Sequence, residues 1–310
     1  MSRGVHSATN TTLATGRQKW LGHLAALSFA LLIAGSFSIG HLAAPHMTPP
    51  ALNGLRFILA ASLLAALYLA RRSSLPTPPR PKSFWRFALI GALMATYFIT
   101  MFMALRITSP VSTGAVFTLI PLMSAAFGYI ILRQTTGPVV LFSLLVAAAG
   151  ALWVIFKGDL QALLSFRIGQ GELIFFVGCV GHALVAPLVK LLNRGEDGLT
   201  FTLGTVTGTM VCVLLVGVGE LVDTDLTTMP PIVWVAIAYL AIFTTATTFF
   251  LVQYASMRLP ASKVLSYGYL TPVAVILIEG AIGHGWPSLS IMIGAGITAA
   301  ALAAMAVAAD

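Results

Sequence analysis

The chain has 310 residues, of which 58% are hydrophobic and only 8% are charged. Soluble domains carry about 25% charged residues, so this composition excludes a soluble enzyme, a disordered chain and a disulfide-stabilised scaffold. A mean hydropathy of +0.95 favours a polytopic membrane protein. The formal net charge of +8 does not indicate a nucleic-acid binder, because Lys and Arg of membrane proteins gather in cytoplasmic loops.

Ten apolar runs follow one another along the chain, each close to the roughly 20 residues that a helix needs to cross a bilayer. A polar tail, residues 1–19, precedes the first run, and breaks such as Pro49-Pro50 and Pro230-Pro231 separate later ones. The sequence therefore predicts an all-α polytopic membrane protein of ten transmembrane helices. The runs are 20–43, 50–70, 84–105, 109–132, 136–156, 169–192, 199–219, 230–256, 260–283 and 287–308.

The basic residues predict the orientation of these helices. With a cytoplasmic N-terminus, thirteen Lys and Arg residues fall in cytoplasmic segments and three, Arg106, Lys157 and Arg167, fall outside. Arg56 lies within the second span, near its outer end, where helix packing or snorkelling explains it. The positive-inside rule therefore predicts that both termini are cytoplasmic.

The chain contains a weak internal repeat. A shift of 151 residues places Ala104–Pro121 on Ala255–Pro272 without a gap and Phe98 on Phe249. Each half holds five spans, so the halves have opposite orientations, as in the inverted repeats of secondary transporters. We expect a first repeat over 20–156, an external linker over 157–168 and a second repeat over 169–310.

The tracts that end at Pro121 and Pro272, together with Gly35-Ser36 and Leu55-Arg56-Phe57, carry a family resemblance. Over nearly its whole length the chain resembles the EamA branch of the drug/metabolite transporter superfamily. The resemblance implies an inner-membrane carrier of small metabolites, often an exporter of amino acids or drug-like compounds. It also implies a central cavity lined by the first, third, fourth, sixth, eighth and ninth spans.

Two titratable residues within spans are candidates for proton coupling, because ionisable groups are costly in a membrane. His182 lies near the centre of the sixth span, where it could also bind substrate, and Glu279 lies two helical turns after Pro272. The alternatives are a neutral His182 that donates to a backbone carbonyl and a Glu279 that reaches water at the outer end. Pro121 and Pro272 are the candidate hinges, since each interrupts a helix and frees the carbonyl of Phe117 or Gly268.

Further candidate substrate contacts come from helical spacing. Lys263 and Tyr267 share one face of the ninth span and could hold an anionic group, although the positive-inside rule favours a basic interface anchor as the role of Lys263. Phe249 and Gln253 share a polar and aromatic face of the eighth span with Thr245. Tyr97 and Phe98 occupy the related region of the first half. Such a lining suits amphipathic organic substrates, and ordinary helix packing is the alternative for each residue.

Several motifs typical of ATPases and enzymes are missing from the sequence. It contains no GxxxxGK[ST] loop and no CxxC, HExxH or GxSxG motif, so we expect neither ATP hydrolysis nor an enzyme site, and no cofactor or metal. A permease subunit with a separate ATPase and an uncoupled facilitator remain open. We expect a small-molecule substrate, a bilayer environment and a monomer or weak dimer, because Gly204–Gly208 forms a GxxxG pattern more typical of packing within a protein.

Overall fold

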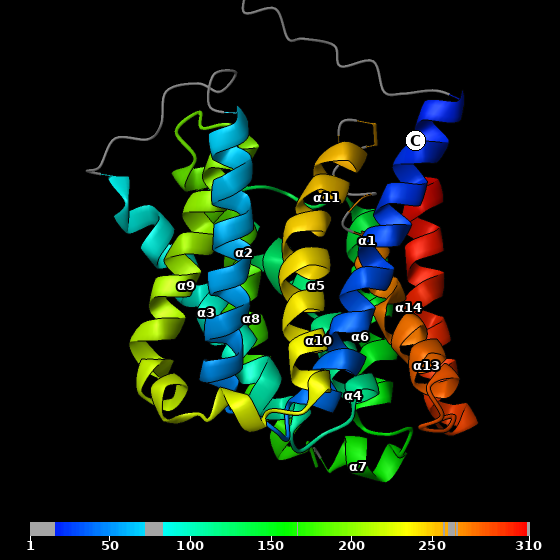
Figure 1. The fold of residues 1–310 in the computed structure, drawn as a ribbon. Coiled ribbons are helices and arrows are strands. Elements are labelled where there is room, and N and C mark those ends of the chain that lie inside the picture. The colour runs from blue at the N-terminus through cyan, green and yellow to red at the C-terminus, as the bar shows by residue number, and fades with distance from the viewer. Residues whose placement is uncertain are drawn as a thin grey trace, which may run out of the picture.

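The computed structural model describes residues 16–71, 83–165, 167–256, 258–259, 264 and 266–308. Over these residues the fold is helical and contains no strand, so the all-α prediction is confirmed. Figure 1 shows the helices arranged as a bundle. In chain order the elements are α1 (Gly16–Ala43), α2 (Pro49–Arg71), α3 (Trp85–Leu105), α4 (Pro110–Phe117), α5 (Ile120–Leu132), α6 (Pro138–Ile155), α7 (Leu160–Leu164), α8 (Gln170–Leu192), α9 (Gly198–Asp223), the short η3 (Leu226–Thr228), α10 (Pro231–Ala241), the π-helical η4 (Ile242–Thr247), α11 (Thr248–Ser256), the 3₁₀-helical η5 (Tyr267–Leu270), α13 (Thr271–Ala281) and α14 (Leu289–Ala308).

Local sequence explains where several helices begin. Pro110, Pro138 and Pro231 each open a helix, where the missing N–H of proline costs nothing. The Ser109 side chain caps α4 by accepting from the Ser112 N–H at 3.2 Å. The Asp197 carboxylate caps α9 by accepting from two backbone N–H groups.

Membrane spans account for most of the described chain. Eight stretches are long and apolar enough to cross a bilayer, counting α4 with α5, and α10 with η4 and the start of α11, as single stretches. Two further apolar helices, Tyr267–Ala281 and Leu289–Ala301, are shorter. The described residues therefore confirm a polytopic helical protein and give eight full-length spans where the sequence predicts ten.

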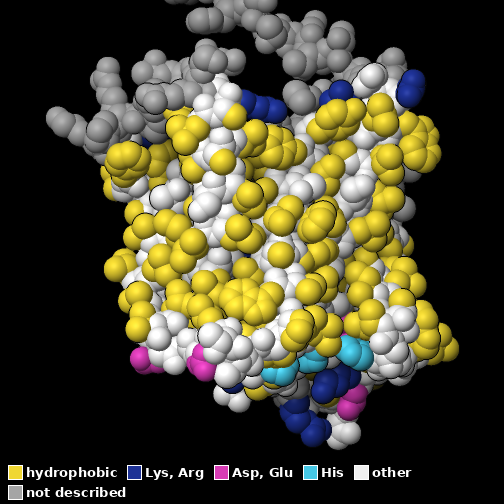
Figure 2. All heavy atoms as spheres, in the orientation of Figure 1, with side chains coloured by type: hydrophobic (Ala, Val, Ile, Leu, Met, Phe, Trp, Pro, Cys, Tyr) yellow, Lys and Arg dark blue, Asp and Glu magenta, His cyan; other side chains and the backbone are white. Residues whose placement is uncertain are grey.

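Charged side chains gather at the two ends of the bundle (Figure 2). The start of α1 and the end of α14 lie at the same end, which we call the tail end, and α7 lies at the opposite end, which we call the α7 end (Figure 1). The face shown in Figure 2 is covered by hydrophobic side chains between the two ends, and its acidic and His side chains gather at the α7 end. A broad apolar band with polar ends is what a bilayer requires.

Contacts between a helix of the first half and one of the second half recur between the counterparts of those helices. The packing of α3 on α8 corresponds to that of α1 on α10 and α11, and the packing of α5 on α8 corresponds to that of α1 on α13. Three further pairs each join a helix to its own counterpart in the other half: α2 with α9, α4 with α13 and α6 with α14. This pattern supports the predicted repeat on grounds independent of sequence identity.

Glycines allow the closest of these contacts. A Cβ atom at Gly208 would collide with the Phe87 carbonyl of α3, and one at Gly91 would collide with the Gly208 backbone. Gly204 packs against the Phe87 ring. The GxxxG pattern therefore joins α9 to α3 within the protein, as predicted.

Candidate functional site

A cavity of about 320 Å³ lies at the centre of the bundle. Helices from both halves line it, and its volume suits a small organic molecule. The lining is mainly apolar and aromatic, with a few polar side chains. It comprises Phe29, Ile33, Ser36, Arg56, Met94, Tyr97, Phe98, Met101, Phe117, Thr118, Ile120, Pro121, Ser124, His182, Val185, Ala186, Thr244 and Gly268.

Three of the predicted substrate contacts meet in this cavity. Tyr97 and Phe98 of α3 contact each other edge to face with centroids 4.9 Å apart, and the Tyr97 ring lies 4.6 Å from the His182 ring of α8. The buried Nδ1 atom of His182 has no hydrogen-bond partner. The bond to a backbone carbonyl that was the alternative for His182 is therefore not made by Nδ1, which remains available to a ligand.

Arg56 also lines the cavity, so of the two explanations given for it, packing within the bundle and snorkelling, the structure rules out snorkelling. Its side chain is only 2% exposed, because α2 carries it about 10 Å inward from the helix start at Pro49. The guanidinium carbon lies 4.0 Å from the Phe98 ring centroid and 5.1 Å from that of Phe57, so it rests on aromatic faces.

The polar partners of Arg56 come from the π-helical segment η4. Its Nη2 atom donates to the hydroxyl oxygens of Thr244 and Thr245, both at 3.3 Å. Each threonine hydroxyl in turn donates to the Leu240 carbonyl at 2.9 Å. The wider π turn lets two consecutive side chains reach the same group, and π segments recur at functional sites. No sequence signal predicts this segment, and Thr244 is not among the predicted site residues.

Both predicted proline interruptions border the cavity region with the same local structure. The α4–α5 helix breaks at Thr118 and Leu119, whose N–H groups bond to carbonyls three residues back, and Pro121 follows in the cavity wall. The 3₁₀ helix η5 precedes Pro272 in the same way. The Gly268 carbonyl accepts from the Thr271 N–H, so it is not left free as expected, because the tighter turn supplies another donor.

Glu279 lines a different pocket, of about 620 Å³, at the α7 end. Its Oε2 atom lies 2.8 Å from Nδ1 of His284, and its buried Oε1 atom has no hydrogen-bond partner. Glu279 is buried and paired, so it does not simply extend into water. His41, Arg106 and Lys157 line the same pocket. Both halves line each of the two pockets, and we take the smaller, central cavity as the candidate site because the broken helices border it.

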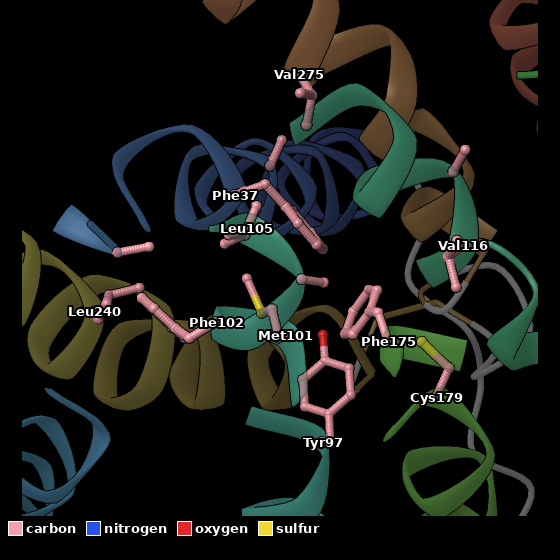
Figure 3. Packing of buried hydrophobic residues seen from close by; sticks show 14 of the residues in the cluster. Phe37, Tyr97, Met101, Phe102, Leu105, Val116, Phe175, Cys179, Leu240 and Val275 are labelled. Carbon is pink, nitrogen blue, oxygen red and sulfur yellow. The ribbon is translucent and has the colours of Figure 1, made fainter. Parts of the chain in front are cut away.

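An aromatic layer lies between the two cavities, which share no lining residue. Phe37 and Phe175 are fully buried with ring centroids 6.1 Å apart, and Phe175 lies 5.4 Å from Tyr97. Phe37 also contacts Phe117 at 5.7 Å. Figure 3 shows Phe37, Tyr97 and Phe175 turned toward one another from three helices. The central cavity is therefore closed toward the α7 end.

Two of the remaining predicted contacts, Phe249 and Tyr267, do not line the cavity. Phe249 packs with the apolar cluster between α2 and α9, and its ring contacts Phe250 at 5.3 Å. The Tyr267 hydroxyl lies 2.9 Å from Nδ1 of His23 on α1. Lys263 and the side chain of Gln253 lie outside the described residues, so their predicted roles stay predictions.

An ion pair at the tail end holds α3 against the loop after α8. Arg86 is buried at the start of α3, where it pairs with Glu196 and donates to the Leu192 carbonyl. The hydrogen bond from Arg86 is the main reason that the pKa of Glu196 falls to about 2. The backbone N–H of Arg194 donates to the same carboxylate at 2.7 Å.

Comparison with known proteins identifies the family. A family model described as the EamA-like transporter family matches residues 20–156 and matches again over residues 169–307. The chain belongs to the EamA-like transporter family. This result confirms the resemblance found in the sequence, and it shows that the chain contains two EamA repeats.

Two relatives from Bacillus subtilis (strain 168) are named as uncharacterized transporters. YyaM is 26% identical over 258 residues, which cover 83% of this chain and 84% of that protein. YetK is 20% identical over 266 residues, which cover 86% and 81%. A solved structure titled "Crystal structure of protein" matches with a TM-score of 0.64 and 19% identity over 95% of this chain and 98% of that one. This last likeness shows that the two chains share one fold over nearly their whole length.

Proposed function

We propose that this EamA protein is a secondary transporter that exports a small organic metabolite, such as an amino acid or a drug-like compound, across the inner membrane by alternating access. The observation that carries the proposal is the central cavity of about 320 Å³, which both repeats line beside broken helices. Secondary transporters built from inverted repeats bind substrate at such discontinuities near the membrane midplane. The proposed carrier holds no cofactor and works as a monomer or weak dimer.

The proposed topology has ten spans with the tail end in the cytoplasm. Together η5 and α13 extend about 24 Å, and α14 about 30 Å, which brings both close to the thickness of a hydrocarbon core. The ninth predicted span begins at residue 260, in a stretch that the structure describes only in part. The α7 end, with its acidic and His side chains, then faces outward.

Alternating access requires that the cavity open to one side at a time. In the proposed cycle, the aromatic layer of Phe37, Phe117, Tyr97 and Phe175 is the barrier on the outer side. The broken helices at Pro121 and Pro272 let the two repeats rock, which opens that barrier and closes the cavity toward the cytoplasm.

We further propose that His182 and Glu279 exchange protons during this cycle. His182 faces the central cavity, and Glu279 faces the outer pocket beside His284. The two residues therefore lie on opposite sides of the aromatic layer, an arrangement in which one group is accessible from each side. Protons could be loaded at one residue and released at the other as the barrier moves.

The test uses purified protein in proteoliposomes, with a substrate first found by growth of an overexpressing strain on toxic amino acids and drugs. A pH gradient should drive uptake by the wild type without ATP. His182→Asn or Glu279→Gln should abolish gradient-driven uptake and keep substrate exchange at zero gradient. Exposed His46→Asn and Glu220→Gln serve as matched controls and should keep both activities.

Each other outcome points to a different conclusion. Flux that requires added ATP and a second protein would replace the proposal with a permease subunit. Flux that ignores the gradient in the wild type would indicate an uncoupled facilitator. Gradient-driven uptake that survives in both variants and in the double variant would assign His182 and Glu279 structural roles.

A further inference from the structure

The central cavity contains one strong cationic group, and that group lacks an anionic partner. Arg56 has no carboxylate within ion-pair distance in the described part of the chain. Its Nη2 atom is occupied by Thr244 and Thr245, whereas its buried Nε and Nη1 atoms have no hydrogen-bond partner. A guanidinium carries five N–H bonds, so Nε and Nη1 leave three donors unused.

An unpaired arginine in the middle of a membrane protein is costly to keep. A buried cation becomes tolerable when an anion and hydrogen-bond acceptors complete its shell. The described lining of the cavity supplies neither Asp nor Glu for this purpose. The missing partner of Arg56 is therefore a group that enters the cavity from outside the protein.

The surroundings of Arg56 define what else the ligand must carry. The guanidinium rests on Phe98, Phe98 contacts Tyr97, and Tyr97 contacts His182, in steps of 4.0, 4.9 and 4.6 Å. This row of rings begins at the unpaired donors of Arg56 and ends at the unpaired Nδ1 of His182. A ligand lying along it would place an apolar or aromatic body against the rings and a charged head at Arg56.

The charge balance selects among anionic head groups and excludes cations. One guanidinium neutralises a monovalent carboxylate, whereas a phosphate monoester carries up to two negative charges and would leave one of them unmatched. A cationic amine would meet Arg56 with no acidic residue in the described lining to hold it. The cavity therefore favours a head group with one negative charge.

We propose that the substrate class of this carrier is small amphipathic monocarboxylates, with the carboxylate held by Arg56 and the apolar body held by Tyr97 and Phe98. This inference rests on the proposed transport function and narrows it, since it favours organic acids over cationic drugs. His182 would contact a second, uncharged polar group where the substrate has one.

Binding to the purified full-length protein in detergent tests the inference without requiring flux. The probes are acetate, benzoate, phenylacetate and indole-3-acetate, each compared with its uncharged amide, and phenylethylamine as the cation. Thermal-shift and calorimetric titrations should show binding that strengthens with the size of the apolar body. Each aromatic acid should bind on the order of 10-fold or more tightly than its amide, and the amine should not bind.

Arg56→Gln should remove the preference for acid over amide, and Arg56→Lys should restore part of it because the charge returns without the planar guanidinium. Arg106→Gln is the matched control, since Arg106 lines the pocket at the α7 end instead. If Arg56→Gln fails to fold, Arg56→Lys and the acid-to-amide ratio of the wild type still decide the question.

Two results would overturn the inference. One is an equal or tighter affinity for the amides or the amine, and the other is the absence of binding by every acid in the panel. Failure of the proposed transport function looks different, because the protein would then bind the acids selectively yet catalyse no counterflow of them in proteoliposomes.

Discussion

At the scale of single residues, charged side chains in this protein take two contrasting forms. Arg86 at the tail end has a carboxylate partner, Glu196, and a carbonyl partner, Leu192. Arg56 at the centre has hydroxyl partners and unused donors. The first arrangement holds two segments together permanently, whereas the second is complete only when another molecule is bound.

The Arg86–Glu196 pair predicts how stability depends on pH. The folded protein lowers the pKa of Glu196 from 4.5 to about 2, so the pair stabilises the fold above pH 4.5 and loses that contribution as the pH falls toward 2. Glu196→Gln should lower the unfolding temperature at pH 7 by about 2–4 °C and flatten its decline in acid. Unfolding followed by intrinsic fluorescence in detergent measures both effects.

The exposed Glu220 supplies the control for this experiment. Glu220→Gln should leave the unfolding temperature at pH 7 and its decline in acid as they are in the wild type. An unchanged acid response in Glu196→Gln would show that another group dominates the loss of stability.

Sequence reasoning located part of the candidate site. Tyr97, Phe98 and His182 are predicted substrate contacts and Pro121 is a predicted hinge, and all four line the central cavity. The role of Arg56 was missed, because a long side chain one to two turns inside a span can equally snorkel or turn inward. The side chain turns inward because of Thr244 and Thr245, which lie nearly 190 residues further along the chain.

At the scale of elements, three departures from α-helical geometry surround the cavity. The 3₁₀ turn before Pro121, the 3₁₀ helix before Pro272 and the π segment η4 all lie in predicted spans. The two breaks next to proline can be predicted from the sequence, because proline removes a helical hydrogen-bond donor. The π segment has no such marker, since Ile242–Thr247 contains no proline or glycine.

Replacement of Pro121 and Pro272 is predicted to lower the transport rate. Pro121→Ala and Pro272→Ala restore a backbone N–H and let each helix continue through its break, which should stiffen the proposed hinge. We expect folded proteins whose initial transport rates fall several-fold, with substrate binding retained. Initial-rate measurements in proteoliposomes, together with binding in detergent, separate these effects.

Pro138→Ala is the matched control, because Pro138 opens α6 at a position where its N–H would make no helical bond. It should transport at the wild-type rate. Wild-type rates in the Pro121→Ala, Pro272→Ala double variant would refute the hinge role.

At the scale of the whole molecule, the all-helical bundle and its family followed from composition and from the prolines of the repeat. The predicted number of ten spans is not confirmed, because the described residues give eight full-length spans. The ninth predicted run begins at residue 260, and the structure describes residues 260–266 only in part, so the helical stretch counted there begins at Tyr267.

The proposed orientation predicts which loops a membrane-impermeant thiol reagent reaches. In a background with Cys179→Ala and Cys212→Ala, Leu160→Cys on α7 should react from outside intact cells. Thr135→Cys in the exposed α5–α6 loop should react only after the membrane is permeabilised. Reaction of residue 160 only after permeabilisation would reverse the proposed topology.

The exchange of helix contacts between the repeats has a consequence for how the protein is made. The most extensive helix pairs, α3 with α8, α6 with α14 and α2 with α9, each join one repeat to the other. The first repeat leaves the ribosome roughly 10–30 s before the second is complete. During that interval Arg56 lies in the bilayer without Thr244 and Thr245. We therefore expect insertion factors and membrane proteases to bind the nascent first half. A chain truncated after the first repeat should be degraded and should not accumulate as a half-sized carrier.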